Sequence, residues 1–160
     1  MKEHEFSDVV WHKKRDLIYL DKVVPSSKID LNSSIFIISY YSEWCPNCHY
    51  DSKVLAEIFN HYKYRNIKFE LIMMYASFEI SNSFVKSKNL EMSFQMGELL
   101  EKNEELLKET YFTKFKLEIN DTRKWGVPLH LVLGVKKDIV GIIKGEIIKE
   151  NLIEYLNERK

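Results

Sequence analysis

The sequence has few cysteines, no excess of charge and no long apolar segment. Only two of its 160 residues are cysteine, too few for the disulfide framework that braces small secreted proteins. The 24 basic residues balance 24 acidic ones, so nothing predicts a surface for nucleic acid or membrane, where an excess of positive charge is expected. No apolar run approaches the ~20 residues of a membrane-spanning helix. The two cysteines are therefore expected to serve reactivity rather than bracing.

Internal repeats, low-complexity tracts and Gly/Ser linkers are also absent from the sequence. With 45% hydrophobic residues, the chain can bury a full core without disulfides or metals, and we expect one domain over residues 1–160. The first eight residues are charged and contain no apolar core of a signal peptide. Two compartments stay open: the cytoplasm, and an extracytoplasmic location (bacterial periplasm or cell surface, with a leader removed), of which the second is preferred.

Both cysteines lie in one short motif, Trp-Cys-Pro-Asn-Cys at residues 44–48. The β-branched and aromatic run at 35–41 predicts a buried strand before it. Apolar residues recur every three or four positions between 51 and 64, which predicts a helix after it. At such a junction the outward-pointing backbone N–H groups and the helix dipole stabilise an anion. The thiolate is the nucleophile in thiol chemistry, so this position favours a reactive cysteine.

An aromatic strand, Trp-Cys-x-x-Cys and a helix resemble the active-site unit of the thioredoxin superfamily. A second resemblance is Gly-Val-Pro at 126–128, ahead of an apolar run, where family members carry a cis-proline beside the cysteine pair. The resemblance covers about residues 30–158. It implies an α/β, thioredoxin-like fold, with a central mixed sheet flanked by helices and a helical insertion before the cis-proline. The length between Cys45 and Pro128 is most similar to that of TlpA/ResA-like thiol–disulfide oxidoreductases, or of a nucleoredoxin-like relative.

The patterns before the motif are weaker. Residues 1–28 are expected to be an N-terminal extension, in which 1–16 form a short helix or a loose arm. A short apolar run at 17–20 predicts a first strand, and 29–31 predicts a short edge strand between two turn signals.

The patterns after the motif are stronger. Residues 67–75 predict a strand parallel to the one before the motif. The insertion, at about 76–120, contains the pattern of an amphipathic helix from 96 to 111 with a charged outer face. The apolar runs 129–133 and 139–143 predict a β-hairpin. A last helix is expected to bury Ile148, Leu152, Tyr155 and Leu156.

The motif position assigns different roles to the two cysteines. Cys45 is expected to cap the helix, face solvent and attack, with a lowered pKa. Cys48, one turn further in, is expected to be shielded and to resolve the mixed disulfide. The family resemblance implies that five residues border the bound substrate: Trp44, Pro46, Asn47, Val127 and Pro128.

Two more hypotheses for the cysteine pair stay open. The cysteines could be small core residues that happen to lie three positions apart. A zinc site would need two further ligands from His49, His61 or His130, yet no second Cys-x-x-Cys and no His-x-x-x-His is present. We expect neither a metal nor another cofactor.

Asp51 lies where TlpA/ResA-like proteins carry the glutamate of Cys-x-x-Cys-x-x-Glu. A buried carboxylate here would take the proton from Cys48 during resolution, whereas a solvent-facing one would only favour the helix dipole. Ser39 occupies the strand position where thioredoxins bury an acid. His130 could border the substrate groove or be a strand histidine whose ring is hydrogen-bonded. For Asp51 and His130 both alternatives stay open.

The resemblance implies a thiol–disulfide oxidoreductase that exchanges disulfides with protein substrates through the Cys-Pro-Asn-Cys pair. We expect a monomer whose partners are protein thiols and disulfides and a redox partner protein, with no nucleic acid. The direction of transfer (reductant, oxidant or isomerase) stays open. Two alternatives remain: a thioredoxin-fold module that binds partners beside Val127 and Pro128 with incidental redox activity, and a DsbA-like disulfide oxidase.

Overall fold

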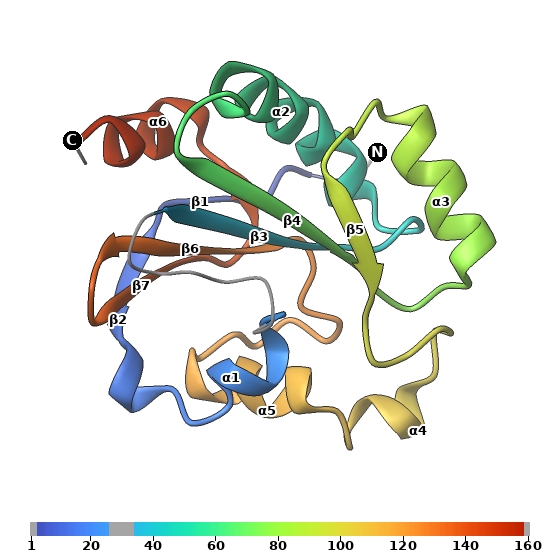
Figure 1. Cartoon of the computed structure of the whole chain (residues 1–160). Coiled ribbons are helices and arrows are strands. Elements are labelled where there is room, and N and C mark those ends of the chain that lie inside the picture. Colours follow the sequence, from blue (N-terminus) through green and yellow to red (C-terminus); the bar gives the residue numbers. More distant parts are fainter. Residues whose placement is uncertain (1–2, 26–33, 159–160) are drawn as a thin grey trace.

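The computed structural model describes residues 3–25 and 34–158. One mixed sheet runs through it (Figure 1). Its strands are β2 (Val10–Lys13), β3 (Ile35–Tyr41), β4 (Ile67–Met73), β5 (Ser93–Met96), β6 (Leu129–Lys136) and β7 (Ile139–Ile143). Their spatial order is β2-β7-β6-β3-β4-β5. The β3–β4 and β4–β5 pairs are parallel, and the other neighbours are antiparallel.

Helices cover both faces of this sheet (Figure 1). One face carries α2 (Pro46–Tyr62), α3 (Phe78–Ser87) and α6 (Lys149–Glu158). The other carries α1 (Leu20–Val23), α4 (Glu104–Leu107) and α5 (Tyr111–Glu118). A single 3-10 turn (Lys14–Asp16) follows β2. The predicted α/β architecture, a mixed sheet flanked by helices, is confirmed.

The strongest sequence patterns correspond to observed elements. All seven residues of β3 are buried, as expected for a strand covered on both faces. The predicted second strand is β4, parallel to β3. The predicted hairpin is formed by β6 and β7, and the last helix, α6, buries Leu152 and Leu156. In the described part of the chain, no helix combines the length and apolar character needed to cross a membrane.

The predictions for the N-terminal residues are wrong. Within residues 1–16, where a helix or loose arm is predicted, β1 (Phe6–Ser7) pairs with β8 (Glu146–Ile147), and β2 forms an edge of the main sheet. Residues 17–20 are not a strand, and α1 begins at Leu20. Leu17 and Leu20 are buried together while Ile18 is 78% exposed; this three-residue spacing suits a helical turn rather than alternation. The predicted edge strand at 29–31 lies outside the described residues.

Gly145 allows β1 to lie against β8. Its φ is +149°, and a Cβ at this position would come 2.2 Å from the carbonyl oxygen of Glu5. That carbonyl accepts a hydrogen bond from the N–H of Glu146 at 2.8 Å. A side chain at position 145 would therefore push the N-terminal strand away.

The predicted helix from 96 to 111 is also wrong. The parallel edge of β4 offers unpaired backbone groups, and residues 93–96 add to it as β5. Beyond β5, the N–H of Gly97 still donates to Met73 (2.8 Å), and Leu99 accepts from Tyr75 (3.0 Å). The helices α4 and α5 in this region each begin at a residue whose side chain caps them: Asn103 caps α4, and Thr110 caps α5. Pairing with the sheet edge therefore overrides the helical periodicity.

Candidate active site

Cys45 is the N-cap residue of α2. Its backbone is extended (φ −86°, ψ 114°), and its Sγ accepts a hydrogen bond from the N–H of Cys48 at 3.2 Å. Pro46 occupies the first helical position, where its missing N–H costs no hydrogen bond. The expectation that Cys45 faces solvent is wrong, because the residue is only 5% exposed. The cause is a loop across the site, whose Val127 carbonyl lies 3.7 Å from Sγ.

The two cysteines are free thiols in different environments. A hydrogen bond from the Cys48 thiol lowers the pKa of Cys45, and the backbone N–H groups of Cys48 and Asn47 add to this against the opposing effect of burial. Cys48 is fully buried. Its burial and its bond to Cys45 raise the pKa of the Cys48 thiol well above the usual range. Cys45 therefore ionises more readily than an ordinary cysteine, whereas Cys48 ionises less readily.

The loop across the cysteines contains a cis peptide bond between Val127 and Pro128. The predicted cis geometry is confirmed, and so is its position beside Cys45, which the Val127 carbonyl contacts. Both residues are buried. The resemblance places both at the substrate, and the loop that carries them lies directly over the sulfur of Cys45.

Arg123 ties this loop together. Its guanidinium donates to the carbonyls of Pro128 (2.9 Å) and Gly126 (3.2 Å). It also makes a two-pronged contact with the Asp121 carboxylate, at 3.0 Å and 2.7 Å. The Lys116 ammonium donates to the carbonyl of Arg123 itself. Because guanidinium presents a rigid fork of donors, this side chain links both flanks of the cis peptide to Asp121.

Three aromatic side chains form a cluster next to Cys45. The Trp44 ring lies edge-to-face with Trp125 at 5.5 Å and tilted against Tyr75 at 6.1 Å. The Tyr75 hydroxyl donates to the Trp125 carbonyl at 2.8 Å. Above them the Lys102 ammonium lies 3.8 Å from the Trp44 ring centre, a cation–π contact. Trp44 and Trp125 are partly exposed, whereas Tyr75 is buried beside them.

The amide of Asn47 points into the protein. The residue is 2% exposed, and its Nδ2 donates to the Glu3 carbonyl (2.7 Å) and the Glu146 carboxylate (3.0 Å). Glu146, also buried, accepts further hydrogen bonds from the N–H of Glu5 (2.5 Å) and from His4 (2.9 Å). The family resemblance implies that Asn47 borders the substrate. Its side chain instead connects the cysteine motif to the N-terminal segment.

Asp51 is a buried carboxylate beneath the cysteine pair, 1% exposed. Its Oδ2 accepts from the Tyr41 hydroxyl (2.7 Å) and lies 2.6 Å from His130 Nε2, and its Oδ1 accepts from the N–H of Ile147 (2.7 Å). The other ring nitrogen of His130 lies 2.7 Å from Ser39 Oγ. The solvent-facing alternative for Asp51 is therefore wrong. For His130 the second alternative is confirmed, since both ring nitrogens are hydrogen-bonded.

No protein-family model and no curated protein matches the sequence. Solved structures do match. A thiol:disulfide interchange protein of the thioredoxin family from Chlorobium tepidum aligns with a TM-score of 0.62 and 14% identity, over 99% of this chain and 98% of its own. That coverage decides the architecture. The chain has a thioredoxin-like fold.

Two further solved structures share this fold. A secreted disulfide oxidoreductase of Mycobacterium tuberculosis, homologous to Escherichia coli DsbE, aligns with a TM-score of 0.56 and 13% identity, over 80% of this chain and 84% of its own. StoA of Bacillus subtilis aligns with a TM-score of 0.55 and 14% identity, over 78% and 83%. At such identities the likeness establishes the thioredoxin-like fold and no activity.

Several residues of the site could not be found from the sequence, because only the thioredoxin-like fold brings them to the cysteines. Arg123 and Trp125 precede the cis-proline closely, which is the one local signal that could have marked them. Lys102 and Glu146 have no such signal. Within the described residues, no three histidine, cysteine or acidic side chains are grouped to hold a metal ion.

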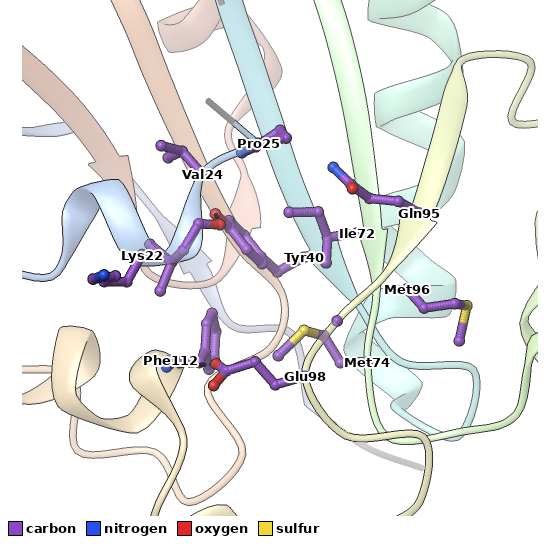
Figure 2. A pocket seen from close by; sticks show the side chains of 12 residues that line it. Lys22, Val24, Pro25, Tyr40, Ile72, Met74, Gln95, Met96, Glu98 and Phe112 are labelled. Carbon is purple, nitrogen blue, oxygen red and sulfur yellow. Dashed lines mark hydrogen bonds between the residues drawn. The ribbon is translucent and has the colours of Figure 1, made fainter. Parts of the chain in front are cut away.

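A pocket of about 320 Å³ lies away from the cysteines, on the sheet face that carries α1 and α5 (Figure 2). Tyr40 lines this pocket, and the Tyr40 hydroxyl donates to the Val23 carbonyl at 2.7 Å. Phe112 and Glu98 border it, and the Glu98 carboxylate accepts from the N–H of Phe112 at 2.9 Å. These groups are engaged in holding α1 and α5, and none of the site residues lines the pocket.

Proposed function

We propose that this protein is a thiol–disulfide oxidoreductase that exchanges disulfides with protein partners. One observation carries the proposal: Cys45, whose pKa is lowered, caps α2 directly under the carbonyl of a cis-proline loop, with a second free thiol within hydrogen-bond reach. Two relatives in fold are described as a thiol:disulfide interchange protein and a disulfide oxidoreductase, which supports the same chemistry.

The first step uses Cys45 as the nucleophile. Its thiolate attacks one sulfur of a partner disulfide, so that a bond forms between Cys45 and that sulfur. The partner's own S–S bond breaks, and the other partner sulfur leaves with the bonding electrons and takes up a proton. The backbone N–H of Cys48 stabilises the anion before attack.

The second step uses Cys48 to release the partner. Cys48 gives up its proton, and the buried Asp51 carboxylate, one turn further along α2, can accept it. The Cys48 sulfur then attacks Cys45, the bond from Cys45 to the partner breaks, and the partner leaves as a second thiolate. Two electrons pass from the cysteine pair to the partner. Transfer in the opposite direction uses the same steps in reverse, and a redox partner protein would restore the starting state.

Insulin reduction by dithiothreitol tests this proposal. Catalytic amounts of the protein should accelerate precipitation of the insulin B chain, and Cys45→Ala should abolish the acceleration. A protein that binds partners equally well without either cysteine and leaves insulin reduction unchanged would be a binding module. The reduction potential of the cysteine pair, equilibrated against glutathione, would establish the direction of transfer.

Cys45 should be the first cysteine alkylated when the reduced protein meets substoichiometric iodoacetamide. Its rate should rise with pH as the thiolate forms, with a midpoint below the ~8.5 of an ordinary cysteine, because the hydrogen bond from Cys48 lowers its pKa. Cys48→Ala removes that bond and should move the midpoint upward. Peptide mapping measures the site of alkylation, and modification of Cys48 first would reverse the assigned roles.

Arg123→Leu should lower kcat/KM for insulin reduction about 10- to 100-fold, because the cis-proline loop loses the fork that fixes it above Cys45. Arg123→Lys keeps the charge but not the fork, and should lie between the two. Lys86→Leu, a change on the exposed side of α3, is the control. Unchanged kinetics in Arg123→Leu would show that the loop is held without this side chain.

A further inference from the structure

The residue His130 stands out because the proposed exchange reaction gives it no role. It lies on β6, two residues after the cis-proline, and is fully buried. It pairs with Ser39 across the β3–β6 ladder, and its ring contacts Ser39 and Asp51 through opposite nitrogens, at 2.7 Å and 2.6 Å. Two directed contacts determine both the position and the tilt of the ring.

We infer that His130 is a positioning residue for the resolving step: through its Nε2–H it holds the Asp51 carboxylate in the orientation that accepts the proton of Cys48. The inference rests on the proposed function, since it concerns the step that releases the partner. His130 itself touches neither cysteine in this assignment and acts only through Asp51.

The hydrogen bonds around Asp51 support this assignment. The carboxylate has three partners that can donate: the Tyr41 hydroxyl, the Ile147 N–H and the His130 ring. These donors come from β3, β8 and β6, and together they fix the orientation of the carboxylate. Burial and the neighbouring Asp51 raise the pKa of Tyr41 well above its usual range, so Tyr41 stays a neutral donor. The His130 ring lies 2.6 Å from Oδ2 and the Tyr41 hydroxyl 2.7 Å from the same oxygen.

Ser39 completes the hydrogen bonds of the His130 ring. When the His130 ring is neutral and Nε2–H donates to Asp51, Nδ1 accepts from the Ser39 hydroxyl. Both nitrogens of this buried ring therefore have a hydrogen-bond partner. An aspartate at position 39 would instead add a second buried negative charge.

The titratable groups near His130 come from β3, α2 and β8. From β3 comes Tyr41, edge-to-face with the ring at 5.7 Å. From α2 come Asp51 and, beyond it, Cys48, whose raised pKa includes an effect of the Asp51 charge. From β8, Glu146 directs its carboxylate to Asn47 and the N-terminal segment instead. Asp51 is therefore the group through which His130 can influence Cys48.

A stopped-flow experiment with the aromatic disulfide dithiobis-nitrobenzoate separates the two steps on the full chain. One equivalent added to reduced protein releases a first coloured thiolate when Cys45 attacks and a second when Cys48 resolves the mixed disulfide. Near pH 7, Asp51→Asn should slow the second release about 100-fold, the low end of the contribution of a general base. His130→Leu should slow it about tenfold while the first release stays within about twofold. His130→Gln, which retains an N–H donor, should recover most of the rate.

Two measurements distinguish positioning from a structural role. In His130→Leu the pH profile of the second release should shift upward, because Cys48 must ionise without a prepared acceptor. The double variant His130→Leu/Asp51→Asn should be no slower than Asp51→Asn alone, since the histidine acts through the aspartate. Equal slowing of both releases, or additive losses in the double variant, would overturn the inference. A first release in the wild type no faster than that of a free cysteine would instead overturn the proposed function.

If His130→Leu fails to fold, Asp51→Asn and Ser39→Ala carry the test, with His130→Gln as the conservative variant. Ser39→Ala removes the partner of Nδ1 and leaves the Nε2–H bond to Asp51 in place. It should slow the second release less than His130→Leu does. A second release that is unchanged in both Asp51→Asn and Ser39→Ala would overturn the inference.

Discussion

Cys48→Ala is expected to arrest the protein on its partners as stable mixed disulfides. Resolution needs a second thiol within bonding reach of the Cys45 sulfur, and this chain has only Cys48. The variant can still attack a disulfide but cannot release the product without an outside thiol. Turnover in insulin reduction should fall by at least about 100-fold, while a covalent adduct accumulates on Cys45.

The trapping reaction should be carried out slightly above neutral pH. The bond from the Cys48 thiol is the largest effect that lowers the pKa of Cys45, so its loss makes the remaining thiol ionise at higher pH and slows the first attack near pH 7. Adducts formed in a lysate are detected by non-reducing electrophoresis. They should disappear with dithiothreitol and should not form in Cys45→Ala/Cys48→Ala. Equal capture by that double variant would mean that binding, not exchange, holds the partners.

Asp51→Ala is expected to destabilise the fold by about 3–5 kcal/mol, the cost of breaking a buried, hydrogen-bonded pair. The change would leave three donors without an acceptor: the hydroxyl of Tyr41, the Nε2–H of His130 and the N–H of Ile147. Each unsatisfied buried donor carries a desolvation penalty. Because these donors lie on β3, β6 and β8, the loss of their hydrogen bonds to Asp51 should loosen the packing of α2 against the sheet. Urea unfolding followed by circular dichroism measures the effect.

Two further variants serve as references for the stability of Asp51→Ala. Tyr41→Phe removes one hydrogen bond to a charged group and should cost about 1.5–3 kcal/mol. Glu57→Ala breaks an exposed ion pair between α2 and Lys149 and should change the unfolding midpoint little, because water screens both charges. A midpoint for Asp51→Ala as high as that of Glu57→Ala would show that the buried network contributes nothing to stability.

The local patterns in the sequence determined the central part of the fold. The buried run of β3, the cysteine motif at the start of α2 and the parallel β4 could be predicted because each depends on residues that are neighbours in the chain. Gly-Val-Pro pointed to the cis peptide through family resemblance. The predictions failed at 17–20, where a short apolar run suits either a strand or a helix, and at 96–111, where the available edge of β4 overrode the helical pattern.

The chemical environment of the cysteines was decided by the tertiary structure. The sequence shows that Asp51 follows Cys48 by one helical turn, but its partner His130 is 79 residues away, and the partner of His130, Ser39, is 91 residues from it. The exposure of Cys45 depends on a loop whose Val127 lies 82 positions further along, and the inward turn of Asn47 depends on both the N-terminal segment and β8. Periodicity reports which face of an element is apolar. It contains no information on which distant polar groups will meet beneath that face, because those contacts form only when the sheet order and the strand register are set.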